Sequence, residues 1–90
     1  MKAAIKKKTL RRLKIIRGQL QGLMHMVEEE KYCIDIITQS SAIKQALSGV
    51  EDLVLKNHLE THVMHQMRNG KPEKATAEIL KVYRLAQRKG

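Results

Sequence analysis

Apolar side chains recur at steps of three and four residues along most of this chain, which is the spacing of a helix that buries one face. One such run extends from about residue 6 to about residue 29, a second from about residue 33 to about residue 68, and a third from about Glu73 to Arg88. The sequence has one proline and five glycines, too few turn residues for a protein made of many short strands. We therefore predict an all-α fold in which each protomer has three helices.

Polar breaks separate the predicted helices. The first is the charged stretch of residues 28–31, and the second is the order of Gly70 before Pro72, which is usual at a helix end. An unbroken middle helix of about 36 residues would be about 54 Å long, and a lone three-helix chain could not cover its apolar stripe. A break at Gly49 is the alternative, since glycine costs about 1 kcal/mol relative to alanine within a helix. The stripe keeps its phase across Gly49, so we expect an unbroken helix and a dimer or larger assembly.

The length of 90 residues allows one small domain, so we expect residues 1–90 to form a single helical domain and exclude a multidomain enzyme. The longest apolar run is three residues, against the roughly 20 needed to cross a bilayer. The lysine-rich start lacks the apolar segment of a secretory signal, and we expect a cytoplasmic protein with no membrane span. The one cysteine, Cys33, cannot form an internal disulfide and is available as a nucleophile or metal ligand.

Positive charge is concentrated at the start of the chain. Residues 1–17 contain no acidic side chain and supply +8 of the formal net charge of +9. Such a patch suits a polyanion, and the presence of two tyrosines without tryptophan or phenylalanine leaves little for stacking single-stranded bases. We therefore predict binding to duplex DNA, with a merely solvated helix face as the alternative. The predicted DNA-binding residues are Lys7, Lys8, Arg11, Arg12, Lys14 and Arg17.

Cys33, His58 and His62 form a candidate metal site. The two histidines are four residues apart, so on a helix both imidazoles project from one face and can share one ion. One thiolate with two imidazoles is a soft donor set that favours Cu(I) or Zn(II) and can also take Ni(II) or Co(II). Along a continuous helix, about 37 Å separates Cys33 from His58, so one chain cannot close the site. Two antiparallel copies of the helix would bring Cys33 of one beside both histidines of the other, which predicts a site shared across a dimer.

Three motifs resemble those of the copper-sensing operon repressor family, and the resemblance covers nearly the whole chain. Residues 12–22, RLKIIRGQLQG, are similar to the family's first helix, and the pair Tyr32-Cys33 is similar to the start of its second. Residues 57–62, NHLETH, resemble its second ligand motif. The resemblance implies an antiparallel dimer bundle that pairs into a disc-shaped homotetramer, with metal ligands contributed across the dimer interface. By position, those ligands fall on Cys33, His58 and His62.

Details of the resemblance favour copper among the signals that this family senses. Tyr32 and Glu78 match a tyrosine and a glutamate that surround the site in copper members, where such groups orient the ligands through hydrogen bonds. Nickel and cobalt sensors resemble one another in an additional N-terminal histidine, and residues 1–24 contain none. Lys2 lies where formaldehyde sensors have a proline, and His62 replaces both the last cysteine of many copper sensors and the second cysteine of persulfide sensors.

The resemblance implies a transcriptional repressor that binds operator DNA without metal and releases it when Cu(I) binds, which relieves repression of metal efflux and homeostasis genes. The alternatives within the family are a repressor that responds to nickel, cobalt or zinc, or to formaldehyde or persulfide through Cys33. A metal carrier without DNA binding is the alternative from another class. We expect no enzyme, since a small helical chain leaves little room for a substrate pocket. His65 is retained as an occasional extra ligand, and His25 is interpreted as structural.

Overall fold

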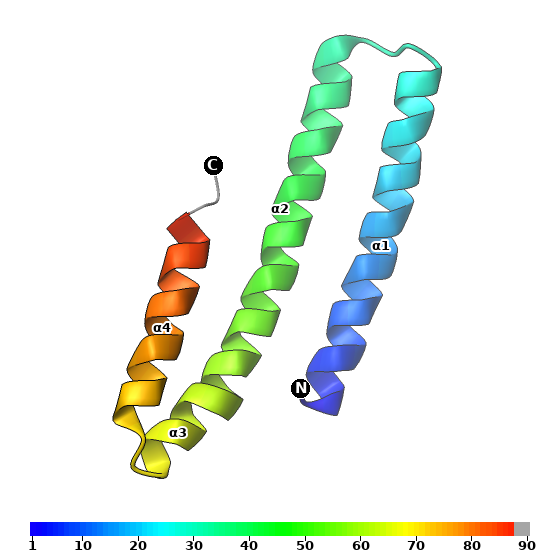
Figure 1. The fold of residues 1–90 in the computed structure, drawn as a ribbon. Coiled ribbons are helices and arrows are strands. Elements are labelled where there is room, and N and C mark those ends of the chain that lie inside the picture. The colour runs from blue at the N-terminus through cyan, green and yellow to red at the C-terminus, as the bar shows by residue number, and fades with distance from the viewer. Residues whose placement is uncertain (88–90) are drawn as a thin grey trace. The chain divides into compact units, whose positions relative to one another are not determined.

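The computed structural model describes residues 1–87, and every element in them is helical (Figure 1). In chain order the elements are α1 (Ala3–Glu28), α2 (Cys33–His58), the π-helix η1 (Leu59–Val63), α3 (Met64–Arg68) and α4 (Pro72–Gln87). The predicted all-α fold is therefore confirmed. Within residues 1–87 no helix combines the length and the apolar character that a membrane span requires.

The elements α2, η1 and α3 follow one another with no turn between them, so the helical path runs from Cys33 to Arg68. His58 and Val63, which flank and close η1, both have right-handed helical backbone angles. This path confirms the predicted middle helix, and with α1 and α4 it gives the three-helix protomer. Gly49 lies inside α2 and does not interrupt it. The predicted end of the last helix, Arg88, lies outside the described residues.

The sequence pattern did not predict the π-helical turn of η1. There the backbone N–H of Met64 donates to the carbonyl of Leu59, five residues earlier instead of four. The Thr61 hydroxyl donates to the Asn57 carbonyl at 2.8 Å and so ties η1 to the last turn of α2. Single π turns inside α-helices are uncommon and often occur at functional sites, and this turn contains His62 and directly follows His58.

Helices α1 and α3 end in the same backbone motif. Each is followed by a residue with positive φ, Glu30 at 54° and Gly70 at 67°. In both cases the N–H of this residue and the N–H of the residue after it donate to carbonyls of the last turn, which is the Schellman arrangement. The paired bonds are Glu30 to Val27 and Lys31 to Met26 after α1, and Gly70 to Met67 and Lys71 to Gln66 after α3. Glycine accepts this conformation at no steric cost, whereas Glu30 carries a side chain in it.

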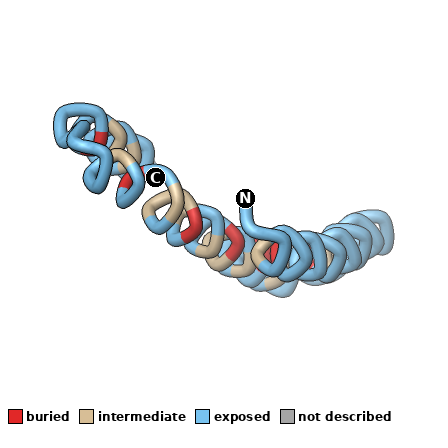
Figure 2. Tube along the Cα trace, turned by 90° about the horizontal axis from the view of Figure 1, so that it is seen from below, coloured by how far each residue is buried: buried red, intermediate tan, exposed pale blue. Residues whose placement is uncertain are grey.

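Two parts of the chain are compact by themselves, residues 2–54 and the chain from Leu55 onward. In the first, α1 and the following part of α2 run antiparallel, and Ile16 of α1 packs with Ile43 and Val50 of α2 (Figures 1 and 2). In the second, α4 folds back along α3 and η1, and Val63 is buried. Each part therefore has a small core of few buried side chains. Burying one side chain of this size contributes about 1.5 to 3 kcal/mol.

Most residues are exposed in the single protomer (Figure 2), and many large apolar side chains are among them. On α2, Leu47 and Val54 continue the stripe of Ile43 and Val50 but are 39% and 37% exposed. A stripe left open in this way favours burial against another copy. The other large apolar side chains exposed on α1 and α2 include Leu10, Leu13, Leu20, Met24, Val27, Ile34 and Ile37.

Candidate metal and DNA sites

His58 and His62 lie side by side where α2 passes into η1. Their ring centroids are 4.9 Å apart and the rings are inclined by 35°. His58 is half-buried and His62 is exposed. The spacing of four residues therefore brings the two imidazoles to one side of the helix, as the sequence predicts.

Glu78, on α4, lies against His58. The distance from His58 Nε2 to Glu78 Oε2 is 2.8 Å, and the two side chains are 31% and 33% exposed. With its hydrogen on Nε2, the imidazole donates to the carboxylate and keeps the Nδ1 lone pair free for a metal ion. The glutamate that the sequence predicts to orient the site thus lies beside the predicted histidine ligand. It contacts Nε2, so Nδ1 would be the nitrogen that binds a metal.

Cys33 lies at the other end of α2 from His58. It is the first residue of that helix, its thiol is exposed and free, and His58 is the last residue of the same 26-residue helix. The preceding Tyr32 is also exposed, and its backbone carbonyl accepts hydrogen bonds from Asp35 and Ile36 in the first turn of α2. Among residues 1–87, no three His, Cys, Asp or Glu side chains of one chain are grouped to hold a metal. One thiolate and two imidazoles would suit a soft metal, but the described part of this chain does not bring Cys33 together with the two histidines.

The other two histidines have partners in their own helices. His25 Nε2 lies 2.8 Å from a carboxylate oxygen of Glu29 near the end of α1. His65 Nε2 lies 3.0 Å from the Asn69 amide nitrogen, which also donates to the His65 carbonyl at 2.9 Å where α3 ends. The spacing of four residues in each pair was visible in the sequence, but Asn69 was interpreted only as a helix-end signal. These contacts agree with a structural role for both histidines.

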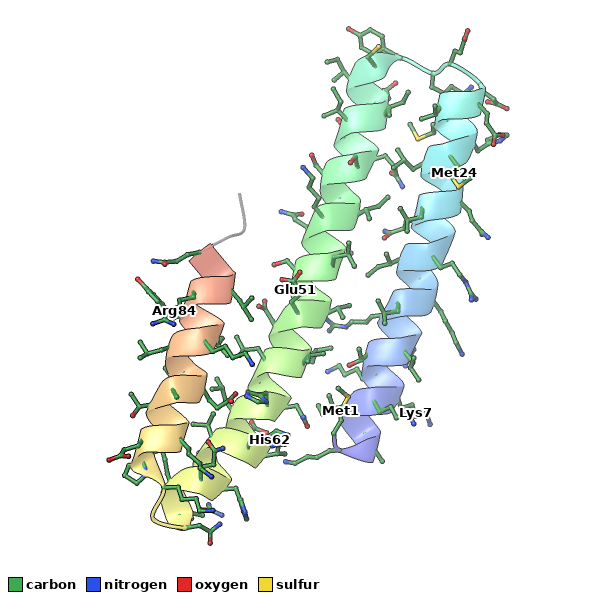
Figure 3. All side chains as sticks on the ribbon, viewed as in Figure 1. Met1, Lys7, Met24, Glu51, His62 and Arg84 are labelled. Atoms are coloured by element: carbon green, nitrogen blue, oxygen red, sulfur yellow. The ribbon has the colours of Figure 1, made fainter. Side chains whose placement is uncertain are left out.

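The predicted DNA-binding residues of α1 do not all lie on one face. At about 100° of rotation per residue, Lys7, Arg11 and Lys14 fall within about 60° of one another, whereas Arg12 points about 140° away from Lys7. All four side chains are exposed, and Figure 3 shows Lys7 directed outward from α1. Arg12 is on the side of α1 that faces α2, where its Nη1 lies 3.3 Å from the position that a Cβ on Gly49 would take. The structure thus separates an outward basic row from one arginine that lies against α2.

Comparison with known proteins gives one consistent result. A family described as metal-sensitive transcriptional repressor matches residues 5–84. The copper-sensing transcriptional repressor CsoR of Bacillus subtilis is 38% identical over 73 residues, which cover 81% of this chain and 72% of the relative. CsoR of Mycobacterium tuberculosis strain H37Rv is 36% identical over 77 residues, which cover 86% of this chain and 65% of the relative.

A solved structure is similar over nearly the whole chain. It is the crystal structure of the copper-sensing repressor CsoR with Cu(I) from Geobacillus thermodenitrificans NG80-2. The TM-score is 0.88 at 34% sequence identity, and the match covers 98% of this chain and 92% of that chain. The likeness therefore extends to the helices that carry Cys33, His58 and Glu78.

Proposed function

The chain belongs to the family of metal-sensitive transcriptional repressors, and from this premise we propose that it is a Cu(I)-responsive repressor. In this proposal the metal-free assembly binds operator DNA, and Cu(I) binding releases the DNA. The observation that carries the proposal is the pair of adjacent imidazoles of His58 and His62, with Glu78 holding His58 by Nε2 at 2.8 Å. Relatives described as copper-sensing, one of them solved with Cu(I), support the choice of metal.

The proposed ligands are Cys33, His58 and His62. A thiolate and two imidazoles match the preference of Cu(I) for soft donors. Glu78 holds the His58 ring so that Nδ1 is presented, and Tyr32 adds a hydroxyl next to Cys33 in sequence. Fixing ligands from outside in this way typically changes metal affinity or activity by about 10- to 100-fold.

The site is proposed to span two chains. Cys33 and His58 occupy opposite ends of α2, so antiparallel packing of two such helices would supply Cys33 from one protomer and both histidines from its partner. The exposed stripe residues Leu47 and Val54 support such packing, because a dimer would remove them from water. A homotetramer made of two such dimers, as the family resemblance implies, is part of the proposal.

The proposed DNA contacts come from α1. Its outward row of Lys7, Arg11 and Lys14 is exposed, and residues 1–17 carry +8 without an acidic side chain. Contacts of this kind neutralise phosphates and release counterions, so affinity should fall steeply with salt. Lys8 and Arg17 lie on either side of this row. Arg12, which lies against α2, completes the proposed surface.

Repression is proposed to end because Cu(I) favours a state that binds DNA less well. Typical coupling energies of about 1 to 3 kcal/mol change an affinity roughly 5- to 150-fold. The contact between His58 and Glu78 links the ligand pair to α4, so α4 is the element whose position we expect the metal site to control. Glu78 is thus assigned both the orientation of His58 and the link to α4.

The test is an anaerobic titration of the reduced protein with Cu(I) against a competing chelator. We expect one tightly held Cu(I) per protomer, strongly weakened in Cys33→Ala and in His62→Ala. His65→Ala is the matched control, because that histidine is three residues from His62 and is held at the end of α3 by Asn69. Weak binding, or binding that all three variants share, would overturn copper as the signal and direct the search to nickel, cobalt, zinc, formaldehyde or persulfide.

A second measurement separates a repressor from a metal carrier. A repressor should bind duplex DNA with an affinity that falls with salt and with added Cu(I). Tight Cu(I) binding without any salt-dependent affinity for duplex DNA would instead support the carrier.

A further inference from the structure

Arg12 and Gly49 make a close contact between α1 and α2. A Cβ built on Gly49 would lie 3.3 Å from Arg12 Nη1, closer than an ordinary van der Waals contact between carbon and nitrogen. A side chain at Gly49 would therefore require the guanidinium to shift from its present position by at least a few tenths of an ångström. Gly18 and Gly22 of α1, by contrast, have nothing within 4 Å of an added Cβ.

The buried neighbours of Arg12 fix its place in the seam between the two helices. Thr9 and Ile16, three residues before it and four after it, are 8% and 4% exposed. Ile16 packs in one cluster with Val50, the residue after Gly49. The backbone on both sides of the contact is therefore held by a core, while the Arg12 side chain as a whole stays exposed.

We propose that Gly49 is a positioning residue for DNA binding, because its missing side chain leaves the space beside α2 that the Arg12 guanidinium occupies and from which it would contact a DNA phosphate. An arginine on a free helix face gives up many rotamers when it binds, whereas a guanidinium that already lies close to a neighbouring helix has fewer to give up. The fork of N–H donors suits a phosphate bidentately. The inference rests on the proposed function and extends it, since one cation of the DNA-binding surface depends on α2 as well as on α1.

The test replaces Gly49 and asks whether the resulting change in DNA affinity depends on Arg12. Valine is the informative side chain, since its two methyl groups add bulk beyond Cβ and are restricted to few rotamers in a helix. The probe is a fluorescent mixed-sequence duplex of about 30 base pairs, titrated with metal-free protein between about 50 and 200 mM salt. The variants are Gly49→Val, Arg12→Ala and both together, with Gly22→Val as the control for adding valine where space is open.

We expect Gly49→Val and Arg12→Ala each to weaken binding about tenfold and to reduce the slope of log affinity against log salt by about one. The double variant should bind no more weakly than Arg12→Ala, because Gly49 acts through that side chain. Gly22→Val should bind the duplex with nearly the affinity and the salt slope of the unsubstituted protein. Circular dichroism and assembly size verify that each variant folds. If Gly49→Val does not fold, Gly49→Ala replaces it, and we expect a smaller loss of DNA affinity.

Two results would overturn the role of Gly49. One is an unchanged affinity and salt slope in Gly49→Val while Arg12→Ala weakens binding. The other is a double variant in which the two losses multiply, which would mean that Gly49 acts independently of Arg12. If the unsubstituted protein shows no salt-dependent affinity for the duplex, the proposed function itself fails, and the role of Gly49 fails with it.

Discussion

Twenty positions separate His58 from Glu78 in the sequence, yet His58 Nε2 and Glu78 Oε2 lie 2.8 Å apart. This contact joins the end of α2 to the middle of α4. Only the imidazole ring would separate a group bound at His58 Nδ1 from the Glu78 carboxylate on α4. The pair therefore provides a direct route by which a ligand of His58 could act on another helix.

Replacing Glu78 by glutamine should separate metal binding from DNA release. The amide keeps the size of the side chain and an oxygen that can accept the His58 N–H, but it removes the negative charge of the carboxylate. We predict that Glu78→Gln retains Cu(I) affinity within about tenfold, while the loss of DNA affinity on adding Cu(I) becomes several-fold smaller. Chelator competition measures the first quantity and fluorescence anisotropy of a labelled duplex measures the second.

Glu73→Gln is the matched control, because Glu73 is an exposed glutamate in the first turn of the same helix. This control should release DNA as the unsubstituted protein does. Full release by Glu78→Gln would remove Glu78 from the coupling, and its contact with His58 would then be only structural.

A site shared between chains predicts complementation. Cys33→Ala and His58→Ala protomers should each fail to hold Cu(I) tightly. In a heterodimer of the two variants, one of the two sites receives an intact Cys33 from one chain and intact His58 and His62 from the other. We predict about half the normal Cu(I) stoichiometry in isolated heterodimers, measured by titration after co-expression with two different tags. No recovery would exclude the shared site, and mixing either variant with itself supplies the baseline.

The sequence predicted the helices because their apolar period is long and regular. The interruption at residues 28–31 and the order of Gly70 before Pro72 placed the helix ends within a few residues of those observed. The π turn of η1 was not predicted, although the apolar stripe takes one step of five residues, from Val54 to Leu59, where η1 begins. The tertiary position of Glu78 required the resemblance, since no local spacing relates residues in different helices.

For the candidate sites, the success of sequence reasoning depended on distance along the chain. The pairing of His58 with His62 follows from helical spacing and is present in the structure. The six basic residues of α1 were grouped by their position in the sequence, and their division into an outward row and Arg12 depends on which side of α1 faces α2. A glycine predicts only flexibility or close packing, so Gly49 gave no sign that an arginine lies against it.

The two Schellman ends predict opposite effects of glycine and non-glycine substitutions on stability. Gly70→Ala places a side chain at φ 67° and should lower the free energy of unfolding by about 1 kcal/mol. Glu30→Gly removes a side chain from φ 54° and should raise it by roughly 0.5 to 1 kcal/mol.

Urea unfolding at one fixed protomer concentration measures both changes, since association contributes to the stability of an assembly. Glu28→Gly is the control, because Glu28 is still helical. Glycine at this position should lower the free energy of unfolding by about 1 kcal/mol. Equal destabilisation at positions 28 and 30 would contradict the backbone explanation.

The buried hydroxyl of Thr9 predicts a stabilising substitution. Thr9 is 8% exposed, and its Oγ1 has no hydrogen-bond partner among the described residues. Valine has nearly the same shape without the polar group, so Thr9→Val should raise the free energy of unfolding by about 1 kcal/mol in the same urea experiment. Thr61→Val is the matched comparison, because the Thr61 hydroxyl donates to the Asn57 carbonyl at 2.8 Å and its loss should instead cost about 0.5 to 1.5 kcal/mol. If both variants lost stability equally, the Thr9 hydroxyl would have to be bonded in the assembled protein, which would place a polar group of another chain beside the seam between α1 and α2.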